Sequence, residues 1–288
     1  MSKVLVTGAA GMLGTDLLAV LAASPSFTVT AATRADLDLT SPAAVRAAVP
    51  GHDLVINAAA WTAVDAAETA EEEATAVNGA AVASLASACA ASGARLIHVS
   101  TDYVLDGVAS SPYPEDAVPA PINAYGRSKL AGERAVLSLL PTAGYVVRTA
   151  WLYGEHGRCF PATMLRLAAS RETVDVVDDQ SGQPTWSLAL ARQLVALAAA
   201  PDAPAGIYHG TASGETTWFG FARAVFALNG LDPDRVRPTT SAKFVLPARR
   251  PSYSVLGHAR WAAAGLSPLP DWHASLTTAV AAGAVKPG

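Results

Sequence analysis

The sequence predicts a doubly wound α/β fold, in which a parallel sheet carries helices on both faces. In the first half of the 288-residue chain, short apolar runs alternate with amphipathic helical stretches, an order typical of βαβ units. The runs are apolar throughout instead of alternating with polar residues, as expected for strands covered on both faces. A glycine-rich segment, residues 8–14, follows the first run directly and is typical of a turn from strand to helix.

The expected elements follow one another in strict alternation. Strands are expected at residues 3–6, 28–32, 54–57, 95–100 and 145–149, and helices at 12–23, 43–49, 71–91 and 125–140. Past Trp151, Pro and Gly become more frequent, and helical patterns recur at 187–200, 218–228 and 271–282. We therefore expect a Rossmann-type domain over residues 1–150 and a smaller, mainly substrate-binding lobe over residues 151–288. The boundary is soft, so segments of the two are free to interleave.

Composition excludes several classes of protein. The net charge is −4, apolar residues make up 51% of the chain and charged residues 15%, which favours a large core over disorder. The sequence lacks the stripe of basic residues that would predict a nucleic-acid partner. Its apolar runs are too short for a signal peptide or a membrane span. Cys89 and Cys159 lack metal-ligand spacing and the six histidines are scattered, so we expect a cytoplasmic protein without a metal site.

The glycine-rich segment is the first candidate site. Gly8, Gly11 and Gly14 let the backbone turn tightly and approach a pyrophosphate. The N–H groups of the helix that begins at Met12 and Leu13 favour an anion. A strand-to-helix turn without a ligand uses the same residues, so the motif alone leaves both readings open.

The end of the second strand bears on the choice of cofactor. Arg34 is suited to the 2′-phosphate of NADP, whereas an acidic residue there favours the free ribose of NAD. A solvated surface arginine is the alternative, and Asp36 lies close by. Asp38 and Leu39 stand where they could flank the adenine, although an Asp in a turn is common. We expect NADPH, with NADH still open.

The third site combines a helix and a strand end. Tyr125 and Lys129 are four residues apart and share a helix face, so the lysine charge is expected to lower the tyrosine pKa from about 10. With seven Tyr and four Lys in the chain, such a pair arises by chance roughly one time in ten. Thr101 ends a predicted parallel strand, where open α/β sheets place their sites. Its hydroxyl can hydrogen-bond a substrate carbonyl, and the ordered set makes coincidence improbable.

Longer motifs extend these sites. They read NAAAWTAVD at 57–65, STDYVLDG at 100–107, YGRSKLAGE at 125–133, RTAWLYG at 148–154, DQSGQPT at 179–185, GIYH at 206–209 and RP at 250–251. With these motifs the chain resembles the extended short-chain dehydrogenase/reductases, and within them the dTDP-4-dehydrorhamnose reductase family, over almost its whole length. The resemblance implies reduction of the C4 keto group of a dTDP-4-keto-6-deoxysugar by NADPH or NADH, in a monomer or a homodimer.

The same resemblance implies roles for individual residues. Tyr125 matches the general acid, Lys129 its pKa-lowering and ribose-binding partner, and Thr101 the hydroxyl that polarises the carbonyl. The implied substrate positions are Asp102, Tyr103, Trp151 and Arg250, of which Trp151 would otherwise be core packing and Arg250 a surface charge. The implied cofactor positions are Gly8, Gly11, Met12, Leu13, Gly14, Arg34, Asp38, Leu39, Ala58, Ala59, Ala60, Thr62, Tyr125 and Lys129.

Some positions depart from the family pattern. Trp61 stands where Tyr or His is usual, Ala66 where Lys is common, and Leu105 where Phe is frequent, which puts the fine choice of substrate in doubt. Some family members form dimers through a magnesium ion held by acidic residues. Asp16 fits one such position but apolar Leu188 occupies another, so no metal is predicted.

Three alternative functions remain open from the sequence. One is a sister reductase that makes a different deoxysugar for an antibiotic or a glycan. Another is a non-catalytic regulatory subunit, since a methionine adenosyltransferase β subunit shares this fold. The third is a 4,6-dehydratase or 4-epimerase, for which Asp102 would supply the acidic residue beside the active-site hydroxyl. Net consumption of NADPH separates a reductase from the last two classes.

Overall fold

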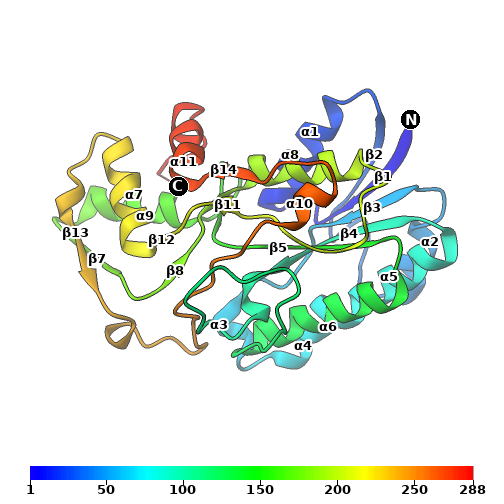
Figure 1. Ribbon diagram of the computed structural model, residues 1–288, viewed down its shortest axis with the longest axis horizontal. Coiled ribbons are helices and arrows are strands. Elements are labelled where there is room, and N and C mark those ends of the chain that lie inside the picture. The colour runs from blue at the N-terminus through cyan, green and yellow to red at the C-terminus, as the bar shows by residue number, and fades with distance from the viewer. Residues whose placement is uncertain (288) are drawn as a thin grey trace.

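A six-stranded parallel sheet forms the centre of the molecule (Figure 1). The computed structural model describes residues 1–287. The strand order is β10-β5-β4-β3-β1-β2. The strands span Ser2–Thr7 (β1), Phe27–Ala32 (β2), Leu54–Asn57 (β3), Arg95–Thr101 (β4), Gly144–Thr149 (β5) and Gly206–His209 (β10). The chain winds in opposite directions from β1 and β3, which confirms the Rossmann-type doubly wound fold and places the topological switch point between them.

Helices cover both faces of this sheet. On one face lie α1 (Met12–Ala22) and α8 (Ser187–Ala198), which bury Leu17 and Leu194 against Val4 and Val6 of β1. On the other face lie α2 (Pro42–Ala48), α5 (Ala81–Ser92) and α6 (Ala124–Leu139), with Leu5 of β1 among their buried contacts. Successive residues of one strand thus enter opposite cores, which is why the strands are apolar at every position.

The helix expected at residues 71–91 is interrupted. The structure has α4 at Glu71–Thr75, a π-helical turn (η1) at Ala76–Ala80, and then α5. The turn carries buried Asn78, whose amide bonds the backbone N–H and C=O of Trp61. Such single π-turns are frequent at functional sites. The stretch Glu71–Ser92 is long and apolar enough to span a membrane, but half of its most apolar window is buried inside the fold, as in a core helix.

The C-terminal lobe has a core of its own, at the left of Figure 1. Aromatic residues dominate that core, among them Tyr153, Trp186, Phe221 and Phe226. Its helices are α7 (Phe160–Ser170), α9 (Trp218–Leu228) and α11 (Trp272–Ala281). Its strands are β6 (Leu152–Tyr153), β7 (Val174–Val177), β8 (Ser181–Gly182), β9 (Thr185–Trp186), β11 (Ala212–Ser213), β12 (Thr216–Thr217), β13 (Val236–Thr239) and β14 (Leu269–Asp271).

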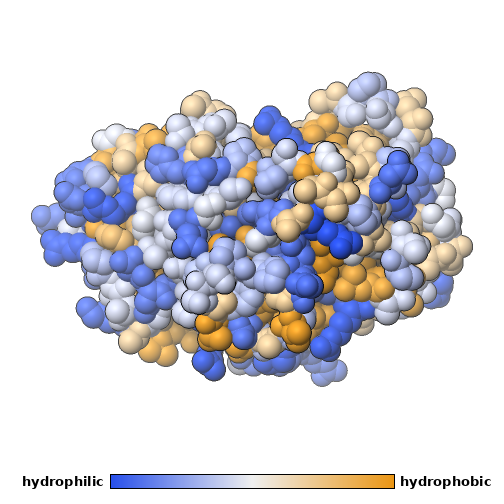
Figure 2. Space-filling view, viewed as in Figure 1, coloured by the Kyte–Doolittle hydropathy of each residue, from blue (hydrophilic) through white to orange (hydrophobic). Residues whose placement is uncertain are grey.

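The two halves of the chain interleave. Strand β10 pairs in parallel with β5 and completes one edge of the main sheet. Helix α8 packs on α1, although more than 150 residues separate them. Smaller elements connect the parts: α3 (Val64–Ala67), α10 (Arg260–Ala263), and 3₁₀ turns η2 (Asp102–Val104), η3 (Pro233–Arg235) and η4 (Ser241–Lys243). On the face in Figure 2, hydrophilic residues predominate and apolar ones form separate groups.

Candidate active site

The carboxyl edge of the sheet gathers the predicted site residues. Strand β1 runs into Gly8, and β4 ends at Thr101, which pairs in register with Thr149 of β5. Helix α6 begins over the same edge, because the Asn123 side chain accepts a hydrogen bond from the Gly126 N–H (2.8 Å) and caps its first turn. This cap places Tyr125 in the first turn of α6 and Lys129 one turn further along.

The glycine-rich turn has the shape of a phosphate cradle. Gly8 has φ +73°, and a Cβ there would stand 2.6 Å from the backbone nitrogen of Ala59. A Cβ on Gly14 would collide with the Gly8 carbonyl oxygen, so neither glycine is replaceable without a backbone shift. Gly11 precedes α1 and supplies no side-chain cap, which leaves the first N–H groups of the helix for an anion. The backbone therefore fits a dinucleotide pyrophosphate.

Arg34 stands free at the end of β2 while the neighbouring acids are occupied. Asp36 accepts from the Thr33 hydroxyl and Asp38 from the Thr40 hydroxyl, each at 2.6 Å. These hydrogen bonds hold the pKa of both carboxyls below the usual range. Arg34 is exposed and takes part in none of the ion pairs found among residues 1–287. Its guanidinium is therefore available to a phosphate, because the carboxylates of Asp36 and Asp38 are bound to hydroxyl groups within their own backbone turns.

Thr101 and Tyr125 meet beside a second tyrosine. The Thr101 hydroxyl donates to Asp102 Oδ1 (2.9 Å) and accepts from the Tyr103 N–H (3.2 Å). The Tyr103 and Tyr125 rings pack edge to face, with centroids 5.9 Å apart. Burial raises the pKa of Tyr125, the charge of Asp102 raises it further, and hydrogen bonding from Thr101 opposes both. The phenol therefore keeps its proton at neutral pH.

Lys129 lies in the interior, against the sheet. Its Nζ donates to the Val99 carbonyl (2.7 Å) and lies 3.5 Å from His98 Nε2. Burial lowers the pKa of Lys129 to about 8, against the charge of Glu133. We expected Lys129 to lower the pKa of Tyr125, but in the protein alone that pKa is raised. The reason is that burial of the phenol and the charge of Asp102 raise this pKa, while the Lys129 ammonium is turned away from the phenol, toward β4.

Asp102 is a buried acid in the same corner. Only 3% of it is exposed. Burial raises the pKa of its carboxyl to about 6, with hydrogen bonding from Ser254 and Thr101 acting against the rise. The charge of Asp102 is therefore sensitive to pH close to neutrality.

Arg250 reaches the site with a partner that the sequence analysis missed. Its Nη2 lies 2.9 Å from Asp65 Oδ2, and the guanidinium carbon lies 6.0 Å from the centre of the Tyr103 ring. Asp65 also accepts from the Ala248 N–H (3.1 Å). The segment around Arg250 is thus fastened to α3 beside Tyr103. Asp65 belongs to a quoted motif, but no sequence signal connects it with a residue 185 positions later.

Trp151 is held in a strained conformation at the same edge. It is the non-glycine residue with positive φ (46°) among residues 1–287, a geometry that costs about 1–3 kcal/mol and clusters at functional sites. Its indole stacks on Trp218, with centroids 3.6 Å apart and planes 12° apart. A Cβ on Gly182 would stand 2.6 Å from the same ring. Trp218 was also missed, because it comes from the distant helix α9.

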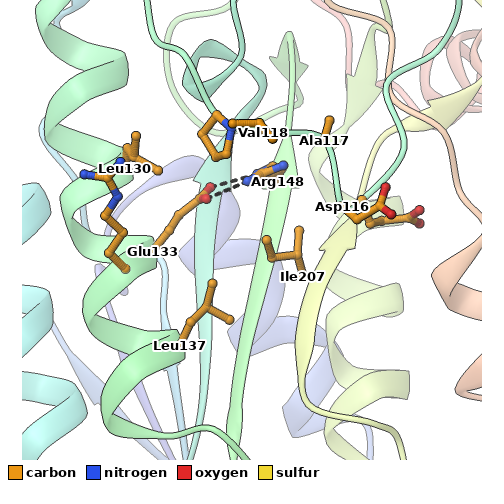
Figure 3. Close-up of a pocket in the computed structure, with 11 residues that line it drawn as sticks. Asp116, Ala117, Val118, Leu130, Glu133, Leu137, Arg148 and Ile207 are labelled. Atoms are coloured by element: carbon orange, nitrogen blue, oxygen red, sulfur yellow. Dashed lines mark hydrogen bonds and ion pairs between the residues drawn. The ribbon is translucent and has the colours of Figure 1, made fainter.

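A buried ion pair lies behind the site. Arg148 of β5 and Glu133 of α6 form a two-pronged pair (3.0 and 2.8 Å), and the Ser100 hydroxyl donates to the same Glu133 carboxylate (2.6 Å). The pair lines a cavity of about 310 Å³ between α6, β5, β10 and residues 115–119. Figure 3 shows the pair among the residues that line this cavity. Thr101, Tyr125 and Lys129 do not line this cavity, so it is separate from the candidate active site.

Asp16 of α1 makes a structural contact with α8. Its carboxylate accepts a hydrogen bond from the hydroxyl of Ser187, the first residue of α8. Residues 1–287 contain no group of three or more His, Cys, Asp or Glu side chains placed to hold a metal.

Comparisons with known proteins place the chain in one family and find similar reductases. Residues 2–285 match the model of the family described as the RmlD substrate binding domain. A dTDP-4-dehydrorhamnose reductase of Streptomyces griseus is 55% identical over 95% of this chain and 91% of its own length. A dTDP-4-keto-6-deoxy-D-glucose reductase of Streptomyces niveus is 53% identical over 96% and 95%. A dTDP-4-dehydrorhamnose reductase of Bacillus anthracis, solved with NADP, superposes with a TM-score of 0.92, 34% identity and coverage of 98% and 99%.

Proposed function

Since the chain belongs to the family described as the RmlD substrate binding domain, we propose that it uses NADPH to reduce dTDP-4-dehydro-6-deoxy-L-mannose (dTDP-4-dehydrorhamnose) to dTDP-L-rhamnose. The observation that carries the proposal is that Thr101 and Tyr125 meet at the edge of the sheet that also holds the glycine-rich turn, with Lys129 one helical turn beyond Tyr125. The two Streptomyces relatives, 53% and 55% identical over nearly the whole chain, are named as reductases of sugars of this class.

The proposed mechanism assigns one task to each side chain. Thr101 and Tyr125 hydrogen-bond the C4 keto oxygen, and NADPH supplies the hydride to C4. Tyr125 then donates its proton to the developing alkoxide, because the raised pKa keeps the phenol protonated until then. Lys129 is assigned to the ribose of the cofactor and carries positive charge below its pKa of about 8. Its ammonium is turned toward β4 in the protein alone, so we assign it to the phenolate only in the complex with NADPH. Donors aimed at a developing charge are usually the largest catalytic contribution.

The remaining site residues are proposed to hold the two ligands. Trp151 is assigned to the sugar, with Asp102 and Tyr103 beside it. Arg250 is assigned to the diphosphate, which would compete with Asp65 for the guanidinium. The turn from Gly8 to Gly14 is assigned to the pyrophosphate of the cofactor, and the small side chains of 58–60 beside it allow close approach. Thr62, Asp38 and Leu39 are assigned to the nucleoside ends of the cofactor.

A second candidate is the sister reductase of another dTDP-4-keto-6-deoxysugar. The 53% identity to the reductase of Streptomyces niveus favours it specifically. An assay across dTDP-4-keto-6-deoxysugars with NADPH and NADH, with identification of the product sugar, separates the two. Absence of NADPH oxidation with every keto sugar would instead favour a regulatory subunit, and product formation without net oxidation a dehydratase or epimerase. We assign the reaction to the cytoplasm, where the free Cys89 and Cys159 would remain reduced, in a monomer or a homodimer.

Replacing Arg34 by leucine is expected to change the choice of cofactor. The KM for NADPH should rise roughly 10- to 100-fold, since a charge-assisted bond to a phosphate contributes about 1.5–3 kcal/mol. The KM for NADH should stay within about twofold, because that ribose carries no phosphate. Steady-state kinetics with both cofactors measure the difference. Arg46→Leu, at an exposed position on α2, is the matched control. An equal loss with both cofactors would contradict the assignment.

A further inference from the structure

A chain of buried polar side chains runs from the first strand to Lys129. The Thr7 hydroxyl donates to Asn57 Oδ1 (2.7 Å), Asn57 Nδ2 lies 3.0 Å from His98 Nδ1, and His98 Nε2 lies 3.5 Å from Lys129 Nζ. Asn57 and His98 are fully buried and Lys129 is 1% exposed. The chain thus joins β1, β3, β4 and α6 beneath the candidate active site.

The orientation of the Asn57 amide fixes the proton on the histidine ring. The backbone N–H of Ala59 bonds Asn57 Oδ1 (3.1 Å), and a backbone N–H can only donate. Oδ1 is therefore the acceptor, and Nδ2 donates to His98 Nδ1. A neutral imidazole has one donor and one acceptor nitrogen, so the proton of His98 lies on Nε2, the atom that faces Lys129.

The ring stays neutral in this position. Burial, and then the charge of Lys129, hold the pKa of His98 well below its usual range. The titratable and charged groups that act on the amine are His98 from β4 and Glu133 from α6, with Arg148 of β5 paired to Glu133. An N–H directed at an amine meets its lone pair, whereas the same N–H directed at an ammonium meets another donor.

We propose that His98 is a positioning residue for Lys129. His98 presents a fixed Nε2–H to the lysine nitrogen and thereby favours the uncharged amine. Asn57 acts through His98 by holding this tautomer. The effect on turnover rests on the proposed function, because there Lys129 must carry charge. Reduction then declines as pH rises through the pKa of Lys129, and His98 sets where that decline begins. The interaction itself exists in the protein without ligands.

Nuclear magnetic resonance of the ligand-free protein tests the tautomer directly. A long-range ¹H–¹⁵N spectrum, assigned with a His98→Met variant, reports which ring nitrogen carries the proton. The expected result is a proton on Nε2 and a ring that stays neutral at pH 6. A proton on Nδ1, or a ring protonated at that pH, overturns the proposal.

Titration of Lys129 tests the consequence. The ¹³Cε signals of the four lysines give the protonation midpoint of Lys129, and His98→Met should raise it by roughly one pH unit. Asn57→Asp should also raise it, because its carboxylate draws the ring proton to Nδ1 and leaves Nε2 to accept from the ammonium. In a His98→Met background, Asn57→Asp keeps only its through-space charge effect and should shift the midpoint less. The control is His52→Met, because the His52 ring is partly exposed and does not belong to the series of buried polar side chains that leads to Lys129. This variant should leave the Lys129 midpoint unchanged.

The kinetic readout separates this proposal from the proposed function. The alkaline limb of kcat/KM should move upward together with the Lys129 midpoint. A midpoint unchanged in the folded variants overturns the role of His98, whatever the activity. A shifted midpoint in a protein that oxidises no NADPH with any keto sugar supports the role of His98 and contradicts the reductase assignment. A merely structural histidine would lower stability and leave the midpoint where it was.

Discussion

Tyr125→Phe is expected to lower kcat by about 10²- to 10⁴-fold, the usual contribution of a positioned general acid. The variant removes one oxygen and keeps the ring that packs edge to face on Tyr103, so the fold and the NADPH dissociation constant should stay unchanged. Stopped-flow oxidation of NADPH and fluorescence titration measure the two quantities.

Tyr153→Phe is the matched control for this prediction. The Tyr153 side chain is buried in the C-terminal lobe, and its hydroxyl has no hydrogen-bond partner among residues 1–287. Removal of an unpaired buried hydroxyl is neutral or stabilising, so that variant should turn over like the parent protein. If Tyr125→Phe retains full turnover, Tyr125 is not the proton donor and the mechanism fails at its centre.

Breaking the buried ion pair is expected to have the largest effect on stability. Glu133→Gln should lower the free energy of unfolding by about 3–5 kcal/mol, because it leaves the Arg148 guanidinium charged in the core without its counterion. Both side chains are almost fully buried, with 0% and 1% exposed. Urea unfolding measures the change.

An exposed ion pair between α4 and α6 provides the control. Glu71 and Arg127 form an equally two-pronged pair, but 43% and 46% of their side chains are exposed. Glu71→Gln should cost about 1 kcal/mol or less, since water screens the pair. The double variant Glu133→Leu, Arg148→Met should recover most of the loss, because it leaves no charge unpaired. Equal costs for Glu133→Gln and Glu71→Gln would show that burial does not govern these pairs.

Features that depend on local sequence were predictable. The turn at Gly8 to Gly14 and the four-residue spacing of Tyr125 and Lys129 can be read from neighbours along the chain. The main strands were also predictable, because burial on both faces leaves a continuous apolar run. Their approximate limits agree with β1 to β5.

Features that depend on pairing across the chain were not predictable. Trp218 lies against Trp151, and Asp65 against Arg250, through segments whose docking no local pattern encodes. The predicted direction of the shift in the Tyr125 pKa was wrong for a related reason. Spacing on a helix shows which side chains share a face, but the depth of burial and the direction of Lys129 Nζ depend on the sheet beneath.

The position of β10 has a consequence for the protein during its synthesis. Until about residue 209 leaves the ribosome, β5 is the outer strand of the sheet, with its row of N–H and C=O groups unpaired. At 5–20 residues per second, the interval between completion of β5 and of β10 is roughly 3–12 s. The apolar surface that α8 later covers on α1 is open for much of the same time. During this interval, a nascent chain of this protein exposes both the unpaired edge of β5 and the apolar surface of α1, the two surfaces that a chaperone would cover.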